Sequence, residues 1–232
     1  MSAPRVAMAL AAGFGTRMGA LTRDRPKPLI EVAGRALIDH ALDDAAAAGV
    51  ERAVVNLHYL GEMIAEHLAD RERPEIAFSP EEALLDTGGG VLRALPLLGP
   101  DPFFCLNADA IWTGARPLPA LAAAWDPARM GAVLHLVRRD DARGHAGSGD
   151  FFADDDGRLV RRGGAAAAPF VFTGAQILTP AAFEGAPGGA FSTNLIWDRL
   201  IDERRLFGVV HEGAWIDVGS PAGLALAEEA LA

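Results

Sequence analysis

The sequence is poor in cysteine, and it has no long apolar segments. Its one cysteine, Cys105, cannot form a disulfide within the chain or build a zinc site from several cysteines. The N-terminal apolar run, residues 6–12, is too short for a signal peptide or a membrane-spanning helix, and Gly13 breaks it. We therefore expect a cytoplasmic protein without a membrane partner.

Positive charge is also scarce in this chain. There are 21 lysine and arginine residues against 31 aspartate and glutamate residues, which gives a net charge of −10, and no long basic run occurs. Nucleic-acid binding needs a basic footprint, so we expect no nucleic-acid partner. A phosphate site in this chain must be built locally, from a few basic side chains and backbone N–H groups.

The chain does contain enough apolar residues for a large core, since half of its 232 residues are hydrophobic. In the first half, short apolar runs alternate with helical patterns. We expect strands at 5–10, 52–57, 76–78 and 103–106, and helices at 36–48, 59–68 and 90–98. This alternation indicates βαβ units, and so predicts an α/β fold with a doubly wound, mostly parallel sheet.

The second half of the chain is less regular, although it shows no repeat and no linker. We expect strands at 130–137 and 169–178, a hairpin at 151–160, a mobile loop at 143–150, and helices at 193–203 and 221–231. We therefore interpret residues 1–232 as one domain.

A glycine-rich segment follows the first predicted strand and reads Ala11-Ala12-Gly13-Phe14-Gly15-Thr16-Arg17. Such a turn exposes backbone N–H groups that can bind phosphate, and an arginine can hold phosphate oxygens in a bidentate fork. It is not a Walker A loop, because no Gly-Lys-Ser/Thr follows, and Met18 stands where a dinucleotide-binding fingerprint needs glycine. If only the two glycines are considered, an ordinary tight turn without a phosphate is the alternative interpretation.

A lysine between two prolines, Lys27, follows ten residues after Arg17. Proline fixes its own φ and restricts the residue before it, so this lysine is suited to act as a fixed point charge. If Lys27 is considered apart from the other motifs, an exposed lysine in a loop is the more common interpretation.

Together, the segments 10–18 and 26–29 resemble the motifs of the sugar nucleotidyltransferase (NDP-sugar pyrophosphorylase) family. Further matches are Pro80-Glu81 with 85–90, the segment 106–109, and the segment 215–221. The short length and the triple glycine at 88–90 are most similar to family members that make a uridylyl derivative of N-acetylmuramate 1-phosphate in peptidoglycan recycling. The resemblance implies a Rossmann-like, glycosyltransferase-A-like nucleotidyltransferase fold, with a nucleoside triphosphate and a sugar 1-phosphate as partners.

The resemblance also implies roles for individual residues. It places Mg²⁺ on Asp109 and Asp217, and it gives Arg17 and Lys27 catalytic roles on the phosphates. It implies nucleotide binding by Ala11, Ala12, Gly13, Gly15, Thr16, Arg17, Glu81, Gly88 and Gly89. It implies sugar binding by Asn107, Thr173, Gly174 and Asn194.

Two positions depart from the family pattern. Many members carry a Glu-Lys-Pro lysine that contacts the sugar phosphate, whereas the region 159–164 has none, and Arg161 or Arg162 is the possible substitute. Glu81 stands where the family commonly has glutamine. A carboxylate only accepts hydrogen bonds, which suits the N3–H of uracil and also the N–H groups of guanine, so Glu81 does not decide the base.

Several functions therefore stay open at this point. UTP is our first choice, and the nearest alternative is a guanylyltransferase that makes GDP-mannose or a GDP-heptose, followed by cytidylyl transfer to an alcohol phosphate. Two alternatives from other classes are a catalytically silent nucleotide-sugar sensor and an NAD-dependent oxidoreductase, the latter opposed by Met18. The sequence leaves the oligomeric state open between monomer and homodimer.

Overall fold

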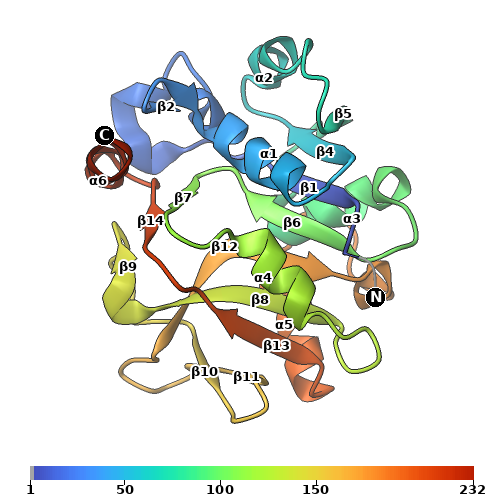
Figure 1. Ribbon diagram of the computed structural model, residues 1–232. Helices are drawn as coiled ribbons and strands as arrows, with labels where there is room; N and C mark the ends of the chain where they lie inside the picture. Colours follow the sequence, from blue (N-terminus) through green and yellow to red (C-terminus); the bar gives the residue numbers. More distant parts are fainter. Residues whose placement is uncertain (1–2) are drawn as a thin grey trace.

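Strand β1 (Val6–Leu10) lies in the middle of a nine-stranded sheet in the computed structural model, which describes residues 3–232 (Figure 1). The main path of the sheet runs β11-β10-β12-β6-β1-β4-β5, and β8 and β13 join it beside β12. On one side of β1 lies β6 (Phe103–Asn107), and on the other lie β4 (Arg52–Leu57) and β5 (Glu75–Pro80). These four strands are parallel.

The three central strands β1, β4 and β6 are short because each is a run of mostly apolar residues buried on both faces, and each run stops at polar or turn residues. Ala9 pairs with Val55 on β4 and with Leu106 on β6, so the carboxyl ends of the three strands are level. The residues that follow the strands, or end them, therefore meet at one edge of the sheet.

The second half of the sheet contains antiparallel pairs. Strand β12 (Phe170–Leu178) is antiparallel to β6 and to β8 (Ala132–Arg138), and β8 is parallel to β13 (Leu206–Val210). The predicted hairpin is formed by β10 (Phe151–Ala153) and β11 (Leu159–Arg161). The α/β class and the mostly parallel sheet are confirmed, and β12 and the edge strand β11 run opposite to the other strands.

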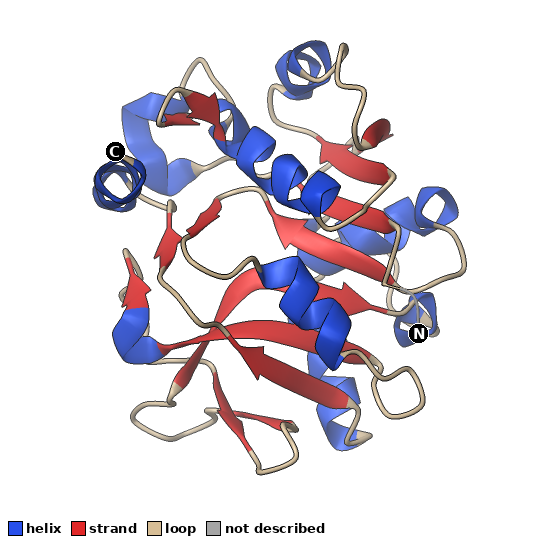
Figure 2. Ribbon diagram, viewed as in Figure 1, coloured by secondary structure: helices blue, strands red, loops and turns tan. Residues whose placement is uncertain are grey.

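Helices cover both faces of the sheet, as expected for a doubly wound fold. Successive residues of β1 alternate: Ala7 and Ala9 pack with α1 (Leu37–Ala47), α2 (Gly61–His67) and α4 (Pro117–Ala124). Met8 packs on the other face, with α3 (Asp86–Leu98) and α5 (Asn194–Asp202). Figure 2 shows α1 and α4 crossing in front of the sheet.

Smaller elements surround the main sheet, and the sequence patterns did not predict most of them. They include a three-stranded sheet of β7 (Ala110–Trp112), β14 (Trp215–Asp217) and β9 (Ala142–Arg143), and a pair of β2 (Glu31–Val32) with β3 (Arg35–Ala36). The predicted C-terminal helix is α6 (Pro221–Leu231). Short 3-10 segments occur at Lys27–Leu29, Arg139–Asp141 and Pro180–Phe183, and a longer one, Thr16–Thr22, is kinked at Gly19.

The triple glycine lies within α3, which begins at Asp86, four residues before the predicted start at 90. A Cβ on Gly88 would lie 2.4 Å from the ring of Phe191, and one on Gly89 would lie 2.3 Å from the carbonyl of Gly189. The glycines are therefore needed because a neighbouring segment crosses the first turn of the helix. Within residues 3–232, no helix is long and apolar enough to span a membrane.

Candidate active site

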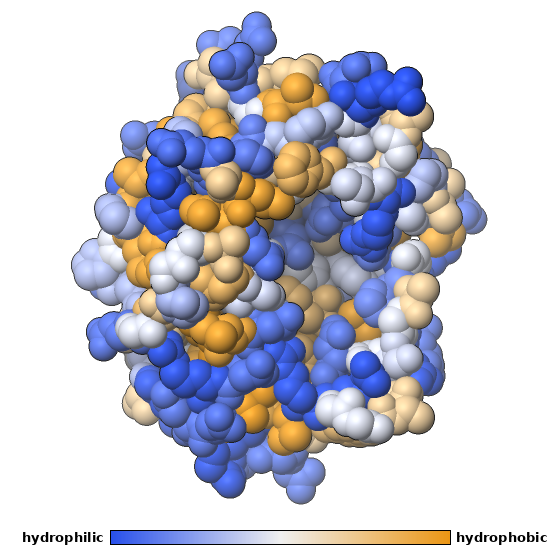
Figure 3. All heavy atoms as spheres, turned by 180° about the vertical axis from the view of Figure 1, so that it is seen from behind, coloured by the Kyte–Doolittle hydropathy of each residue, from blue (hydrophilic) through white to orange (hydrophobic). Residues whose placement is uncertain are grey.

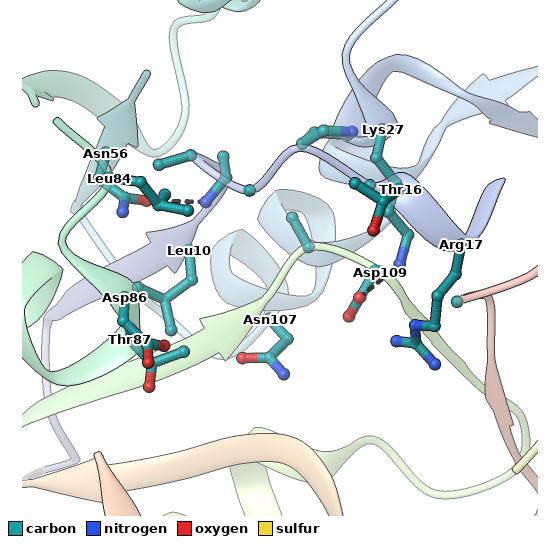
Figure 4. A pocket seen from close by; sticks show the side chains of 17 residues that line it. Leu10, Thr16, Arg17, Lys27, Asn56, Leu84, Asp86, Thr87, Asn107 and Asp109 are labelled. Atoms are coloured by element: carbon teal, nitrogen blue, oxygen red, sulfur yellow. Dashed lines mark hydrogen bonds and ion pairs between the residues drawn. The ribbon is translucent and has the colours of Figure 1, made fainter. Parts of the chain in front are cut away.

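A pocket lies at the carboxyl edge of β1 and β6, where the sequence motifs converge (Figure 4). Of the predicted site residues, it is lined by Ala11, Ala12, Gly13, Gly15, Thr16, Arg17, Lys27, Asn107 and Asp109. The other lining residues had been given no individual role. Asn56 and Leu84 lie outside the motif segments, and the rest lie within them: Leu10, Pro28, Asp86, Thr87, Ala108 and Gly219. Figure 3 shows that the face opposite α1 and α4 is hollowed near its middle.

The glycine loop is shaped by its contact with Lys27. Gly15 has φ +64°, in the left-handed region, and a Cβ at this position would lie 2.9 Å from Cβ of Lys27. The Thr22 hydroxyl donates a hydrogen bond of 3.1 Å to the Gly15 carbonyl. Glycine at this position lets the loop and the lysine segment pack directly against each other.

A buried polar chain holds the start of the loop. The backbone N–H of Ala11 donates to Oδ1 of Asn56 at 2.7 Å, and Nδ2 of Asn56 donates to Oε1 of Glu81 at 2.7 Å. The other oxygen of Glu81 accepts from the N–H of Leu85 at 3.0 Å. Glu81 is 5% exposed and does not line the pocket, so in this structure it supports the loop through Asn56 instead of facing a base.

The amides of Gly88 and Gly89 also have partners within the protein. Both donate to the carbonyl of Phe191, at 2.9 and 3.0 Å, and neither glycine lines the pocket. Their neighbours Asp86 and Thr87 line it instead. A direct base contact by Gly88 or Gly89 therefore stays a prediction, and this packing gives the two glycines a structural role.

Lys27 reaches into the pocket and meets Asp109. Its Nζ lies 2.6 Å from Oδ2 of Asp109, and the lysine is only 9% exposed (Figure 4). The flanking prolines and the 3-10 turn at Lys27–Leu29 fix the backbone from which the lysine extends. The result is a fixed positive charge beside a carboxylate, at the edge of the glycine loop.

Asp217 lies next to this pair, because β14 places it opposite Ala110, directly after Asp109. Burial raises the pKa of Asp217, and the neighbouring carboxylate of Asp109 raises it further, while Arg17 and Lys27 oppose the increase. Nη1 of Arg17 lies 3.7 Å from Oδ2 of Asp217. A Cβ on the pocket residue Gly219 would lie 2.7 Å from Nη2 of Arg17 and from Oδ1 of Asp217, so a larger residue there would displace the ends of these two side chains.

The two carboxylates fit a magnesium ion better than a softer metal. Among the residues that the structure describes, no group of three or more histidine, cysteine or carboxylate side chains could hold a metal. Mg²⁺ commonly uses one or two protein carboxylates and completes its shell with water and substrate phosphates. Asp109 and Asp217 would hold such an ion, and its charge would relieve the repulsion between them.

A second pocket adjoins the first, and the two share Leu10, Thr87 and Asn107. It contains the predicted sugar-binding residues Asn107 and Asn194, and its remaining lining residues are Asp150, Arg161, Phe172, Gln176, Ser192, Thr193 and Trp197. The two pockets are joined by the hydrogen bond from the N–H of Thr193 to the Thr87 hydroxyl, at 2.9 Å.

The predicted pair Thr173 and Gly174 lies beneath this second pocket. Gly174 has φ +89°, and a Cβ there would lie 2.9 Å from Cβ of Asn107, so the glycine shapes the sheet under the asparagine. Thr173 is fully buried, and its hydroxyl donates to the carbonyl of His135 and accepts from the ring Nδ1. Its side chain is therefore engaged in the core and not open to a sugar.

The structure separates the two arginines that the sequence left as alternatives. Arg161 lines the second pocket. Arg162 lies outside both pockets and donates to the carbonyls of Gly149 and Ala165, at 3.0 and 2.9 Å. Arg162 thus stabilises its own loop.

Nucleotidyl transfer has to bring two polyanions together, and a glycine loop, a fixed lysine and paired carboxylates at the edge of a doubly wound sheet meet that need. A family model described as MobA-like NTP transferase domain matches residues 7–172. The chain belongs to this family and is a nucleotidyltransferase. The sequence resemblance is thereby confirmed.

Two curated relatives resemble nearly the whole chain. The N-acetylmuramate alpha-1-phosphate uridylyltransferase of Caulobacter vibrioides is 45% identical over 237 residues, which cover 99% of this chain and 98% of the relative. The protein of the same name from Neisseria meningitidis serogroup B is 36% identical over 220 residues, covering 92% and 93%.

The fold is also found among solved structures. HddC from Yersinia pseudotuberculosis, in a complex with GMP-PN, superposes with a TM-score of 0.78 over 98% of this chain and 100% of its own. The sequence identity is 22%, so this likeness concerns the fold.

Proposed function

We propose that this protein transfers the uridylyl group of UTP to N-acetylmuramate α-1-phosphate in the presence of Mg²⁺. The products are UDP-N-acetylmuramate and pyrophosphate. The observation that carries the choice of substrates is the 45% identity over almost the full length of both chains, which includes both pockets. The contact of Lys27 with Asp109 beside the glycine loop supports the reaction type.

In the proposed reaction, an oxygen of the acceptor phosphate attacks the α-phosphorus of UTP. A new P–O bond forms, and the bond from the α-phosphorus to the bridging oxygen of the β-phosphate breaks, so pyrophosphate leaves. No protein base is needed, because the acceptor phosphate is already an anion. The protein contributes position and positive charge.

The residues of the first pocket divide this work. The loop at 13–15 and the guanidinium of Arg17 hold the β- and γ-phosphates, and Lys27 neutralises charge on the α-phosphate and the acceptor phosphate. Asp109 and Asp217 hold Mg²⁺, which supplies further neutralisation of the phosphoryl oxygens when bound. The adjoining second pocket holds the sugar.

Pyrophosphate release tests this proposal and names both substrates. We would assay UTP, dTTP, GTP, CTP and ATP with Mg²⁺, each against the 1-phosphates of N-acetylmuramate, N-acetylglucosamine and mannose. We expect the highest rate with UTP and N-acetylmuramate 1-phosphate, and none when either substrate is omitted. A preference for GTP with mannose 1-phosphate would replace the proposal with guanylyl transfer. Binding of nucleotide sugars without turnover would indicate a sensor.

A further inference from the structure

The second pocket contains a positive charge that the transfer reaction described above does not use. Arg161 is the only cationic side chain among the residues that line this pocket, whereas Arg17 and Lys27 line the first one. The reacting phosphates must lie beside Lys27 and the two carboxylates. Arg161 is therefore placed to contact a different part of the acceptor.

The guanidinium of Arg161 is held in place on several sides. Its Nε donates to Oδ1 of Asp198 at 2.7 Å, and its Nη2 donates to the carbonyl of Asn194 at 3.1 Å. It lies 5.0 Å from the ring centre of Phe151 and 5.3 Å from that of Trp197. A guanidinium fixed in this way loses little freedom when it binds an anion. Asp198 is 61% exposed, so water screens its opposing charge.

A buried hydroxyl in the same pocket has no partner. Thr193 is 2% exposed, it lines the pocket, and its Oγ1 makes no hydrogen bond to any described residue. A buried polar atom without a partner costs free energy, which a ligand oxygen would recover. Thr193 also precedes α5, whose N-terminal end carries a partial positive charge.

We propose that Arg161 and Thr193 bind a carboxylate on the sugar ring of the acceptor, and so select an acidic sugar 1-phosphate. The inference rests on the proposed function, because N-acetylmuramate is N-acetylglucosamine with an added lactyl ether, which ends in a carboxylate. Arginine binds a carboxylate well, because its planar donors match the two oxygens. The second ionisable group in the pocket, Asp150, accepts a hydrogen bond from the N–H of Phe172 at 2.9 Å and suits a sugar hydroxyl.

The test compares two acceptors that differ only in the lactyl group. We would measure kcat and KM with UTP, for N-acetylmuramate 1-phosphate and N-acetylglucosamine 1-phosphate, in the wild type and in Arg161→Gln. We expect Arg161→Gln to lower kcat/KM for the acidic sugar about 30- to 100-fold, mainly through KM, because a charge-assisted contact is lost. For the neutral sugar, kcat/KM should change less than about threefold.

Thr193→Val keeps the test valid if Arg161→Gln folds poorly. Valine has nearly the shape of threonine, and the Thr193 hydroxyl makes no hydrogen bond in the structure, so its removal leaves no other polar group unpaired. The melting temperature should therefore not fall. We still expect a loss of kcat/KM for the acidic sugar of about fivefold or more, with little change for the neutral one. Arg162→Gln is the matched control, and it should leave the ratio of the two acceptors unchanged.

The outcomes separate this inference from the proposed function. If the wild type transfers uridylyl groups to N-acetylmuramate 1-phosphate but Arg161→Gln and Thr193→Val keep its selectivity, carboxylate binding is overturned and the proposed function stands. An equal loss for both acceptors would assign Arg161 to the sugar phosphate, which also overturns the inference. If the wild type uses neither acceptor with UTP, both proposals fail.

Discussion

Lys27 and Asp109 form an ion pair in the pocket, with 2.6 Å between Nζ and Oδ2. Each of the two side chains also has a role of its own in the proposed reaction. A nucleotide would attract the lysine, and Mg²⁺ would attract the carboxylate. The ion pair holds both side chains in position at the edge of the pocket. A lysine that is 9% exposed would otherwise be an unpaired buried charge.

Replacement of Lys27 by alanine tests its role at the scale of a single residue. We expect kcat to fall roughly 100-fold or more, because a positive charge is removed from the place where negative charge develops. The KM for UTP should rise much less, since Arg17 and the glycine loop still hold the other phosphates. Steady-state kinetics with saturating acceptor measures both values. An unchanged kcat with a raised KM would mean that Lys27 serves ground-state binding.

At the scale of single residues, motifs that determine the backbone indicate which residues lie near one another, but they do not give the direction of a side chain. Gly15, Arg17, Lys27 and Asp109 meet in one pocket, as their motifs indicated. Glu81 instead turns inward to Asn56, because both of its oxygens find buried N–H donors there. A sequence does not show the direction of a side chain. A polar residue near the end of a buried strand, such as Asn56, does indicate that a buried polar partner is needed there.

At the scale of elements, the glycine loop depends on a neighbouring strand. Asn56, on β4, accepts from Ala11 and donates to Glu81, so it ties β1, β4 and the segment before α3 together. The glycine loop begins directly after this hydrogen-bonded segment. The shape of the glycine loop is therefore a property of three elements and not of the motif alone.

Asn56→Ala should weaken both the fold and nucleotide binding. It leaves the N–H of Ala11 and one oxygen of Glu81 without their partner, so we expect the free energy of unfolding to fall by about 2 to 4 kcal/mol. The KM for UTP should rise at the same time. Urea denaturation and kinetics measure the two effects. Ser79→Ala, at the residue on β5 that pairs with Asn56, is the control. An equal effect of this control would contradict the role of Asn56 in joining the three elements.

Long elements were predictable from the sequence, and short ones were not. Buried strands such as β4 and helices such as α6 have runs or periods long enough to recognise. The strands β7, β9 and β14 have two or three residues each and carry no pattern, although β14 places Asp217. Helix α3 begins at Asp86, earlier than the predicted start at 90, because glycine disfavours helices and tertiary packing against Phe191 overrides that preference.

At the scale of the whole molecule, the core contains a histidine, His135, whose pKa lies below its ordinary value. His135 is fully buried, and its Nδ1 meets the Thr173 hydroxyl at 2.9 Å. Burial is the larger cause and the neighbouring His211 the smaller one, and together they lower the pKa of His135 to about 3. Because the Thr173 hydroxyl donates to the His135 carbonyl, it accepts from Nδ1–H, so Nε2 carries the lone pair.

This histidine predicts a loss of stability in mild acid. The unfolded chain binds a proton at His135 below about pH 6.5, whereas the folded protein does not until about pH 3. The free energy of unfolding should therefore fall as the pH drops through this window, and His135 should contribute about 2 kcal/mol between pH 7 and pH 5. Urea denaturation at both values measures it, with His135→Asn as the comparison. An equally steep dependence in that variant would assign the effect to other groups.

The two pockets belong to one nucleotidyl-transfer site in the proposal, and a single experiment tests that claim. Wild-type protein, Mg²⁺, UTP and N-acetylmuramate α-1-phosphate are incubated together, and both products are identified by mass spectrometry. Our account predicts UDP-N-acetylmuramate and pyrophosphate in equal amounts. The appearance of UDP with a further phosphorylated sugar would contradict the attack on the α-phosphorus, and unchanged substrates in the presence of bound nucleotide would contradict catalysis itself.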